Sequence, residues 1–111
     1  METMIGKIES VFFGHGGYQD AFIGIGFTLS GKGWGVSDFR GYWDAEIIHH
    51  SDNCKWSEDG RDREFAETMR YVSKLLADAK CGSVDKLKGK PIEATFDGNM
   101  LKSWRILTEA L

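Results

Sequence analysis

The first half of the chain shows two stretches in which apolar residues alternate with small or polar ones. Between residues 21 and 29 every odd position is apolar, and the even positions include Gly24, Gly26 and Thr28. A two-residue period of this kind predicts a β-strand with one buried face. Residues 5–13 are also rich in β-forming side chains and end at a glycine-rich turn. With a third strand at 34–39, these segments predict an antiparallel meander.

Residues 58–80 have a different period, which predicts a long amphipathic helix. Ser57 is placed to cap its first turn, and Gly82 lies where a left-handed residue would end it. Residues 83–87 predict one further short helical turn. The expected apolar stripe, spaced by four and three residues, is Phe65, Met69, Val72, Leu76 and Ala79.

The last part of the chain predicts a β-hairpin. Apolar residues alternate from Ile92 to Phe96, a turn pair follows at Asp97 and Gly98, and residues 100–107 return as the partner strand. The predicted fold is therefore α+β, with an antiparallel sheet of about five strands in the order β-β-β-α-β-β. One face of this sheet is expected to pack against the long helix. Residues 40–56 show no clear period and are expected to be mostly loop.

Length and charge narrow the class of protein. The chain has 111 residues, which predicts a single globular domain over 1–111, and its formal charge of −3 disfavours nonspecific binding to a phosphate backbone. No long apolar run predicts secretion or membrane insertion, so we expect a cytoplasmic protein. Two cysteines, Cys54 and Cys81, do not make a disulfide scaffold, although a single bridge between them stays open.

The glycine-rich turn is the first candidate for chemistry. Its glycines could expose backbone amides to an anion, and Lys32 in the next turn could add a cation. The alternative is a turn in which the glycines only satisfy backbone geometry. Gly24 and Gly26 leave a groove that an aromatic such as Trp34, a ligand ring or a partner strand would fill. The candidate ligand-binding residues are His15, Tyr18, Gln19, Asp20 and Lys32.

A second candidate is the aromatic segment that follows the third strand. Large aromatic residues near loops are typical of partner-binding surfaces, and we assign Arg40, Tyr42 and Trp43 to such a surface. Trp34 and Trp56 are assigned to the core. Four residues of this segment have side chains that zinc accepts, but no motif fixes a tetrahedral site, so neither metal nor cofactor is predicted. They are His49, His50, Asp52 and Cys54.

Three stretches resemble parts of a family of short proteins of uncharacterised function encoded in tailed-phage and prophage genomes. They read IGKIESVFFGHGGYQD over 5–20, GWGVSDF over 33–39 and LKGKPIEATFDGNMLKSWRIL over 87–107. The resemblance implies a protein made inside an infected bacterium. Small phage accessory proteins often block a host defence or regulatory protein, and some sequester a nucleotide signal.

The sequence therefore leaves two binding functions open, with an enzyme as a third and less favoured hypothesis. The first is a non-enzymatic phage accessory protein that binds a host macromolecule, and the second is a small-ligand binder for nucleotides or nucleotide signals. No motif in the chain predicts a covalent catalyst, and catalytic residues are not assigned. Self-association through an exposed strand edge is a third property that the predicted sheet permits.

Overall fold

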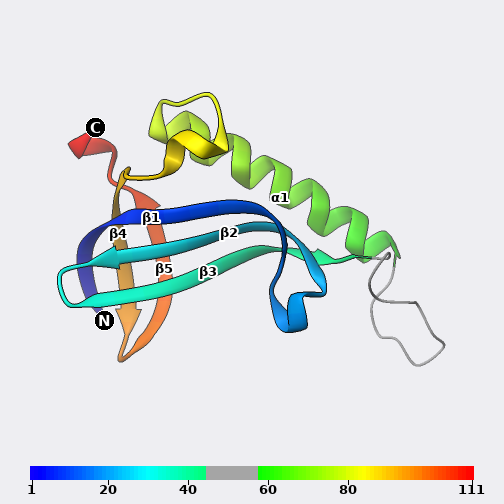
Figure 1. Cartoon of the computed structure of the whole chain (residues 1–111), viewed down its shortest axis with the longest axis horizontal. Helices are drawn as coiled ribbons and strands as arrows, with labels where there is room; N and C mark the ends of the chain where they lie inside the picture. Colours follow the sequence, from blue (N-terminus) through cyan, green and yellow to red (C-terminus); the bar gives the residue numbers. More distant parts are fainter. Residues whose placement is uncertain (45–57) are drawn as a thin grey trace.

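The computed structural model describes residues 1–44 and 58–111, and its elements follow the predicted order (Figure 1). The strands are β1 (Glu2–Gly16), β2 (Phe22–Gly31), β3 (Trp34–Trp43), β4 (Pro91–Asp97) and β5 (Met100–Ile106). The helices are α1 (Glu58–Ala79) and three short 3-10 turns, η1 (Tyr18–Asp20), η2 (Val84–Leu87) and η3 (Thr108–Ala110). The strands form one antiparallel sheet in the order β3-β2-β1-β4-β5, which confirms the predicted α+β fold.

Strand β1 joins two parts of the sheet that run in different directions. Its first residues, 2–7, pair with β4, and residues 7–16 pair with β2. The register with β2 shifts between Ile8 and Ser10, and a bulge of this kind bends a strand and increases its twist. Figure 1 shows the result, because β4 and β5 cross the direction of β2 and β3. The sheet therefore curls around its core.

The core lies on the face of the sheet that α1 covers. Ile8, Ile25 and Ile92 are fully buried there, and α1 contributes Leu75 and Ala79. Burying an aliphatic side chain of this size contributes about 1.5–3 kcal/mol. Edge-to-face aromatic pairs connect elements far apart in the sequence, namely Phe27 with Trp104 at 4.9 Å and Trp34 with Phe96 at 5.3 Å between ring centroids.

Helix α1 differs in two details from the prediction. Its buried residues are Thr68, Leu75 and Ala79, whereas Met69 of the predicted stripe is 51% exposed. The core lies under the second half of the helix, so the first half leaves apolar side chains uncovered. The left-handed residue at its end is Lys80, with φ 55°, and not Gly82. The amide of Cys81 donates to the Leu76 carbonyl at 3.1 Å, which closes the last turn.

The prediction of a loop over 40–56 is wrong for its first four residues. Strand β3 continues to Trp43, because residues 40–43 pair with β2. Gly41 lies opposite Gly24 in this ladder, and the two glycines interrupt the apolar alternation that would have indicated a strand. The rest of the segment, 45–56, lies outside the described residues.

Candidate functional site

The face of β1–β3 that points away from the core has a floor of glycines. On β2 the odd residues face the core, so Gly24, Gly26 and Thr28 face outward. A Cβ added to Gly26 would overlap the Phe12 ring, and one added to Gly16 would lie 2.7 Å from Phe39. The sequence predicted that an aromatic would cover Gly26. The ring is Phe12, however, and Trp34 instead lies against Gly6 and Gly31.

Two phenylalanine rings from different strands meet over this floor. Phe12 on β1 and Phe39 on β3 have ring centroids 6.1 Å apart, and Phe12 is 48% exposed. A hollow of about 350 Å³ lies beside them, which we call the open-face hollow. Its lining residues are Phe12, His15, Gly16, Gly17, Asp20, Gly26, Phe27, Thr28, Ser37, Asp38 and Phe39.

The turn between β1 and β2 forms one end of the open-face hollow. Gln19 and Asp20 both have positive φ, 55° and 54°, a conformation that costs non-glycine residues free energy. The turn is held by His15, whose Nε2 lies 2.8 Å from Asp44 Oδ2, and the Asp44 amide donates to the Ala21 carbonyl at 2.9 Å. These contacts fix the turn to the end of β3.

The predicted ligand-binding set is not brought together. His15 and Asp20 line the open-face hollow, and Tyr18 and Gln19 belong to the turn η1 beside them. Lys32 lies in the turn between β2 and β3, at the other end of β2. Ten residues of strand separate the two turns, a distance of about 30 Å at 3.3 Å per residue. The prediction that Lys32 shares a pocket with His15 is therefore wrong.

The predicted partner-binding residues do not form one surface either. Trp43 is 1% exposed, and the Arg61 guanidinium lies 4.8 Å above its ring, so the prediction that Trp43 lies on the surface is wrong. Tyr42 is half-buried, with its ring 5.9 Å from Phe22. Arg40 is exposed and lies over the Tyr71 ring of α1, whereas Trp43 is buried against Arg61 of the same helix.

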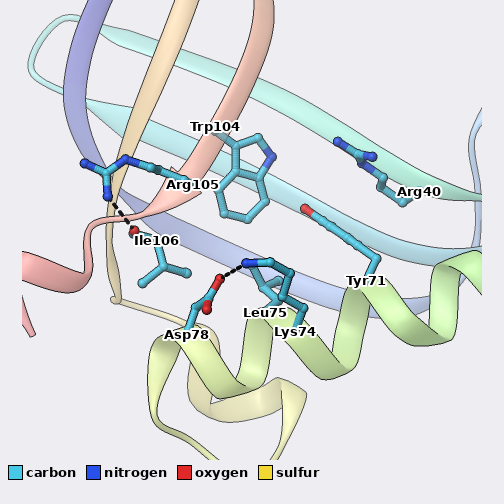
Figure 2. A pocket seen from close by; sticks show the side chains of 8 residues that line it. All are labelled: Arg40, Tyr71, Lys74, Leu75, Asp78, Trp104, Arg105 and Ile106. Carbon is cyan, nitrogen blue, oxygen red and sulfur yellow. Dashed lines mark hydrogen bonds and ion pairs between the residues drawn. The ribbon is translucent and has the colours of Figure 1, made fainter.

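Arg40 instead lines a second cavity, between α1, β3 and β5 (Figure 2). The cavity has a volume of about 280 Å³. Figure 2 shows Tyr71 reaching from α1 toward the two strands, and the Arg40 guanidinium lies 4.5 Å from the Tyr71 ring centroid. Burial raises the pKa of the Tyr71 hydroxyl to about 12, so it remains a hydrogen-bond donor. The lining residues are Arg40, Tyr71, Lys74, Leu75, Asp78, Trp104, Arg105 and Ile106.

The charges of this second cavity are already paired. Lys74 Nζ lies 2.8 Å from Asp78 Oδ2, and Arg105 pairs with two glutamates outside the cavity. Arg40 Nε lies 3.9 Å from Asp38 Oδ2. The same carboxylate accepts a 2.7 Å hydrogen bond from the Trp104 indole. The indole contact connects β5 to β3, and an anionic ligand would have to displace carboxylates from all three cations.

The metal candidates of the sequence lie outside the structural description. His49, His50, Asp52 and Cys54 all fall within 45–57, so the structure tests neither a zinc site there nor a bridge from Cys54 to Cys81. Within residues 1–44 and 58–111, no group of three or more His, Cys, Asp or Glu side chains could hold a metal ion.

The open-face hollow is thus the better candidate site. Sequence reasoning found its glycines, His15 and Asp20 but missed Phe12, Phe39 and Ser37. Glycines in a strand leave space that a neighbouring ring can fill, and this was the only sequence signal for Phe12 and Phe39. None of the helices in the described part of the chain combines the length and apolar character needed to cross a bilayer. Comparison with protein-family models, curated proteins and solved structures gave no match for this chain.

Proposed function

We propose that this protein is a non-enzymatic accessory protein that binds another macromolecule through the open-face hollow. The observation that carries the proposal is the half-exposed Phe12 ring, paired with Phe39 over a glycine floor on a face that α1 leaves uncovered. Contact surfaces between proteins are enriched in aromatic residues and poor in charge at their centre. A rigid sheet that presents rings and small residues fits that description.

The chemistry of the hollow favours a protein partner over a nucleic acid. Its lining contains Asp20 and Asp38 and neither lysine nor arginine. Binding to a phosphate backbone depends on basic side chains that neutralise phosphates. With the resemblance to phage proteins, we infer a host protein of the bacterial cytoplasm as the target, and inhibition of a host defence or regulatory protein as the outcome.

The test is affinity capture with two matched variants. Ser37→Arg places a bulky cation in the hollow, and Ser103→Arg makes the same change on β5, outside it. Both serines are exposed strand residues. The tagged chain would be incubated with nuclease-treated lysate of phage-infected bacteria, and captured proteins would be quantified by mass spectrometry. We expect a near-stoichiometric partner that Ser37→Arg loses and Ser103→Arg retains.

Two results would contradict the proposal. A partner that both variants retain equally would place the contact elsewhere on the molecule. A nucleotide recovered without any protein would instead support the small-ligand function. The structure weakens that alternative, because Lys32 lies far from His15 and the cations of the second cavity are paired.

A further inference from the structure

Among the residues that the structure describes, the second half of β1 is a free strand edge. Residues 7–16 pair with β2 on one side, and β4 occupies the other side only along residues 2–7. The last contact on that side is made by Ile8, which exchanges backbone hydrogen bonds with Lys90 and Gly89. Within the described residues, no strand pairs with residues 10–16 on the side away from β2. Alternate residues there direct backbone N–H and C=O groups outward.

This edge lacks the usual features that prevent pairing with another strand. Proteins protect exposed edges with lysine and other charges, proline or bulges. The stretch SVFFGHG over 10–16 contains no proline or acidic residue, and His15, its one basic side chain, is paired with Asp44. The outer strands of the sheet differ, because β3 carries Asp38 and Arg40 and β5 carries Lys102 and Arg105.

Large apolar side chains project from both faces of the free edge. Phe12 is 48% exposed on the outward face, and Phe13 is 49% exposed on the core-side face. Phe13 borders an apolar groove of about 310 Å³ whose other walls include Phe65 and the half-exposed Met69 of α1. A strand added beside β1 would cover both rings and extend into this groove.

We propose that the occupant of this edge is a second copy of the same chain, paired antiparallel about Phe13. Two-fold symmetry then places Phe13 opposite Phe13 of the other copy, Phe12 opposite Gly14, and Val11 opposite His15. No like charges meet in this register. The two phenylalanines at the centre form a cross-strand aromatic pair, which stabilises antiparallel strands.

The space around Gly14 supports this register. At the glycines Gly16, Gly24 and Gly26, an added Cβ would collide with a ring or with backbone of the same chain. At Gly14 the nearest atom is Phe12 Cδ2 at 3.9 Å, which is ordinary van der Waals contact. Among the described residues, no side chain therefore fills the space that Gly14 leaves on the outward face, and a strand added beside β1 can extend a side chain over it.

Pairing at this edge would join the outward faces of the two copies into one surface of six strands. Two open-face hollows would then lie on the same side of the dimer, one on each side of the symmetry axis. The dimer does not depend on the proposed function, because it forms without a host partner. Its test uses the purified chain alone, so failure of one proposal leaves the other standing.

The test is the mass of the protein in solution by sedimentation equilibrium. We expect twice the 12.5 kDa of one chain for the unaltered protein. Phe13→Lys and Phe13→Glu each place like charges opposite one another and weaken dimerisation by at least about tenfold. A one-to-one mixture of the two variants restores the dimer, because lysine then meets glutamate. Met100→Lys, at an exposed methionine in the β4–β5 hairpin, leaves the dimer intact.

A second variant tests the dimer at another position, so that the test does not depend on the folding of the Phe13 variants. Gly14→Lys has room in the single chain and places a charge on the edge, which opposes strand pairing, so we expect a folded monomer whose Tm no longer depends on protein concentration. An unaltered protein that stays monomeric at about 100 μM would overturn the proposal. So would a dimer that Gly14→Lys leaves unchanged, or mixed Phe13→Lys and Phe13→Glu variants that stay monomeric while both are folded by circular dichroism.

Discussion

The outward face of the sheet has two regions that differ in kind. On β4 and β5 it is charged and paired, because Arg105 lies 3.2 Å from Glu93 and 2.8 Å from Glu109. On β1–β3 it carries Phe12 and Phe39 over glycines, beside a hollow whose lining has two aspartates and no lysine or arginine. Both regions belong to one sheet and both lie opposite the core. The first has the chemistry of a surface that faces water, and the second has that of a surface that meets another molecule.

The exposed strand edges of the sheet differ in charge in the same way. The β5 strand carries Lys102 and Arg105, whereas the free part of β1 carries no acidic residue, lysine or arginine. Charges on an edge oppose pairing with a second sheet. We infer that contacts with other chains are concentrated on β1–β3, and that the β4–β5 hairpin mainly completes the core and fixes the end of the chain.

The largest expected effect comes from the glycine floor. A Cβ at Gly24 would overlap the Arg40 carbonyl and Gly41 Cα, so Gly24→Ala must push β2 and β3 apart. We expect a loss of about 3 kcal/mol in the free energy of unfolding, measured with urea. Gly35→Ala is the matched control on β3, because its nearest atom is 3.8 Å away, and its effect should stay within about 0.5 kcal/mol. Equal losses from Gly24→Ala and Gly35→Ala would contradict close packing of β2 against β3 at Gly24 as the cause.

An intermediate effect is expected where β3 and β5 are joined on the core side of the sheet. Trp104→Phe keeps a ring against Phe27 but removes the donor to Asp38, the hydrogen bond that connects β5 to β3. We expect a loss of about 1.5 kcal/mol in the free energy of unfolding. A double-mutant cycle with Asp38→Ala, which removes the acceptor, checks the cause, since the two losses should be clearly less than additive. Additive losses would mean that the hydrogen bond does not stabilise the contact between β5 and β3.

The smallest effect belongs to the charged region and depends on pH. Hydrogen bonds from Arg105 lower the pKa of Glu109 to about 2 from 4.5. A lowered pKa stabilises the fold above the unfolded value of 4.5, and this contribution is lost as the pH falls through 2. Glu109→Gln should therefore lower Tm slightly at pH 7, with a difference that disappears near pH 2. The pairing is solvent-exposed, so the shift is small.

Glu2→Gln serves as the control for this measurement, because it removes the same charge from an exposed position on β1. A Glu109→Gln difference that persists unchanged at low pH would contradict the ion pair as its cause. It would point instead to packing of the C-terminal turn η3.

Local patterns in the sequence were sufficient to predict the fold. The two-residue period of β2, the turn at Asp97 and Gly98, and the long helical period each depend on residues close in the chain. The length of β3 was missed because Gly41 hides its alternation. Three residues of the predicted α1 stripe, Val72, Leu76 and Ala79, do pack on the core, whereas Met69 is exposed. The position of the helix on the sheet depends on distant contacts, and the sequence does not show which half of the helix covers the core.

The candidate site was only partly predictable for the same reason. His15 and Asp20 lie in a turn that the glycines mark, and they do line the hollow. Phe12 and Phe39 meet only because the register of three strands places both rings over the same glycines. Register is a property of paired strands, and a single strand does not specify it. Lys32 was assigned to the wrong end of the sheet because proximity along the chain was taken for proximity in space.

The most direct test of the difference between the two outward regions is site-specific photo-crosslinking in infected cells. A photoreactive amino acid would replace Ser37 in the hollow or, in a separate variant, Ser103 on β5. We expect Ser37 to give one dominant crosslink to a host protein and Ser103 to give none above background. Crosslinks from Ser103 alone, or equal crosslinks from both positions, would contradict the central claim that partner contact is made by the outward face of β1–β3.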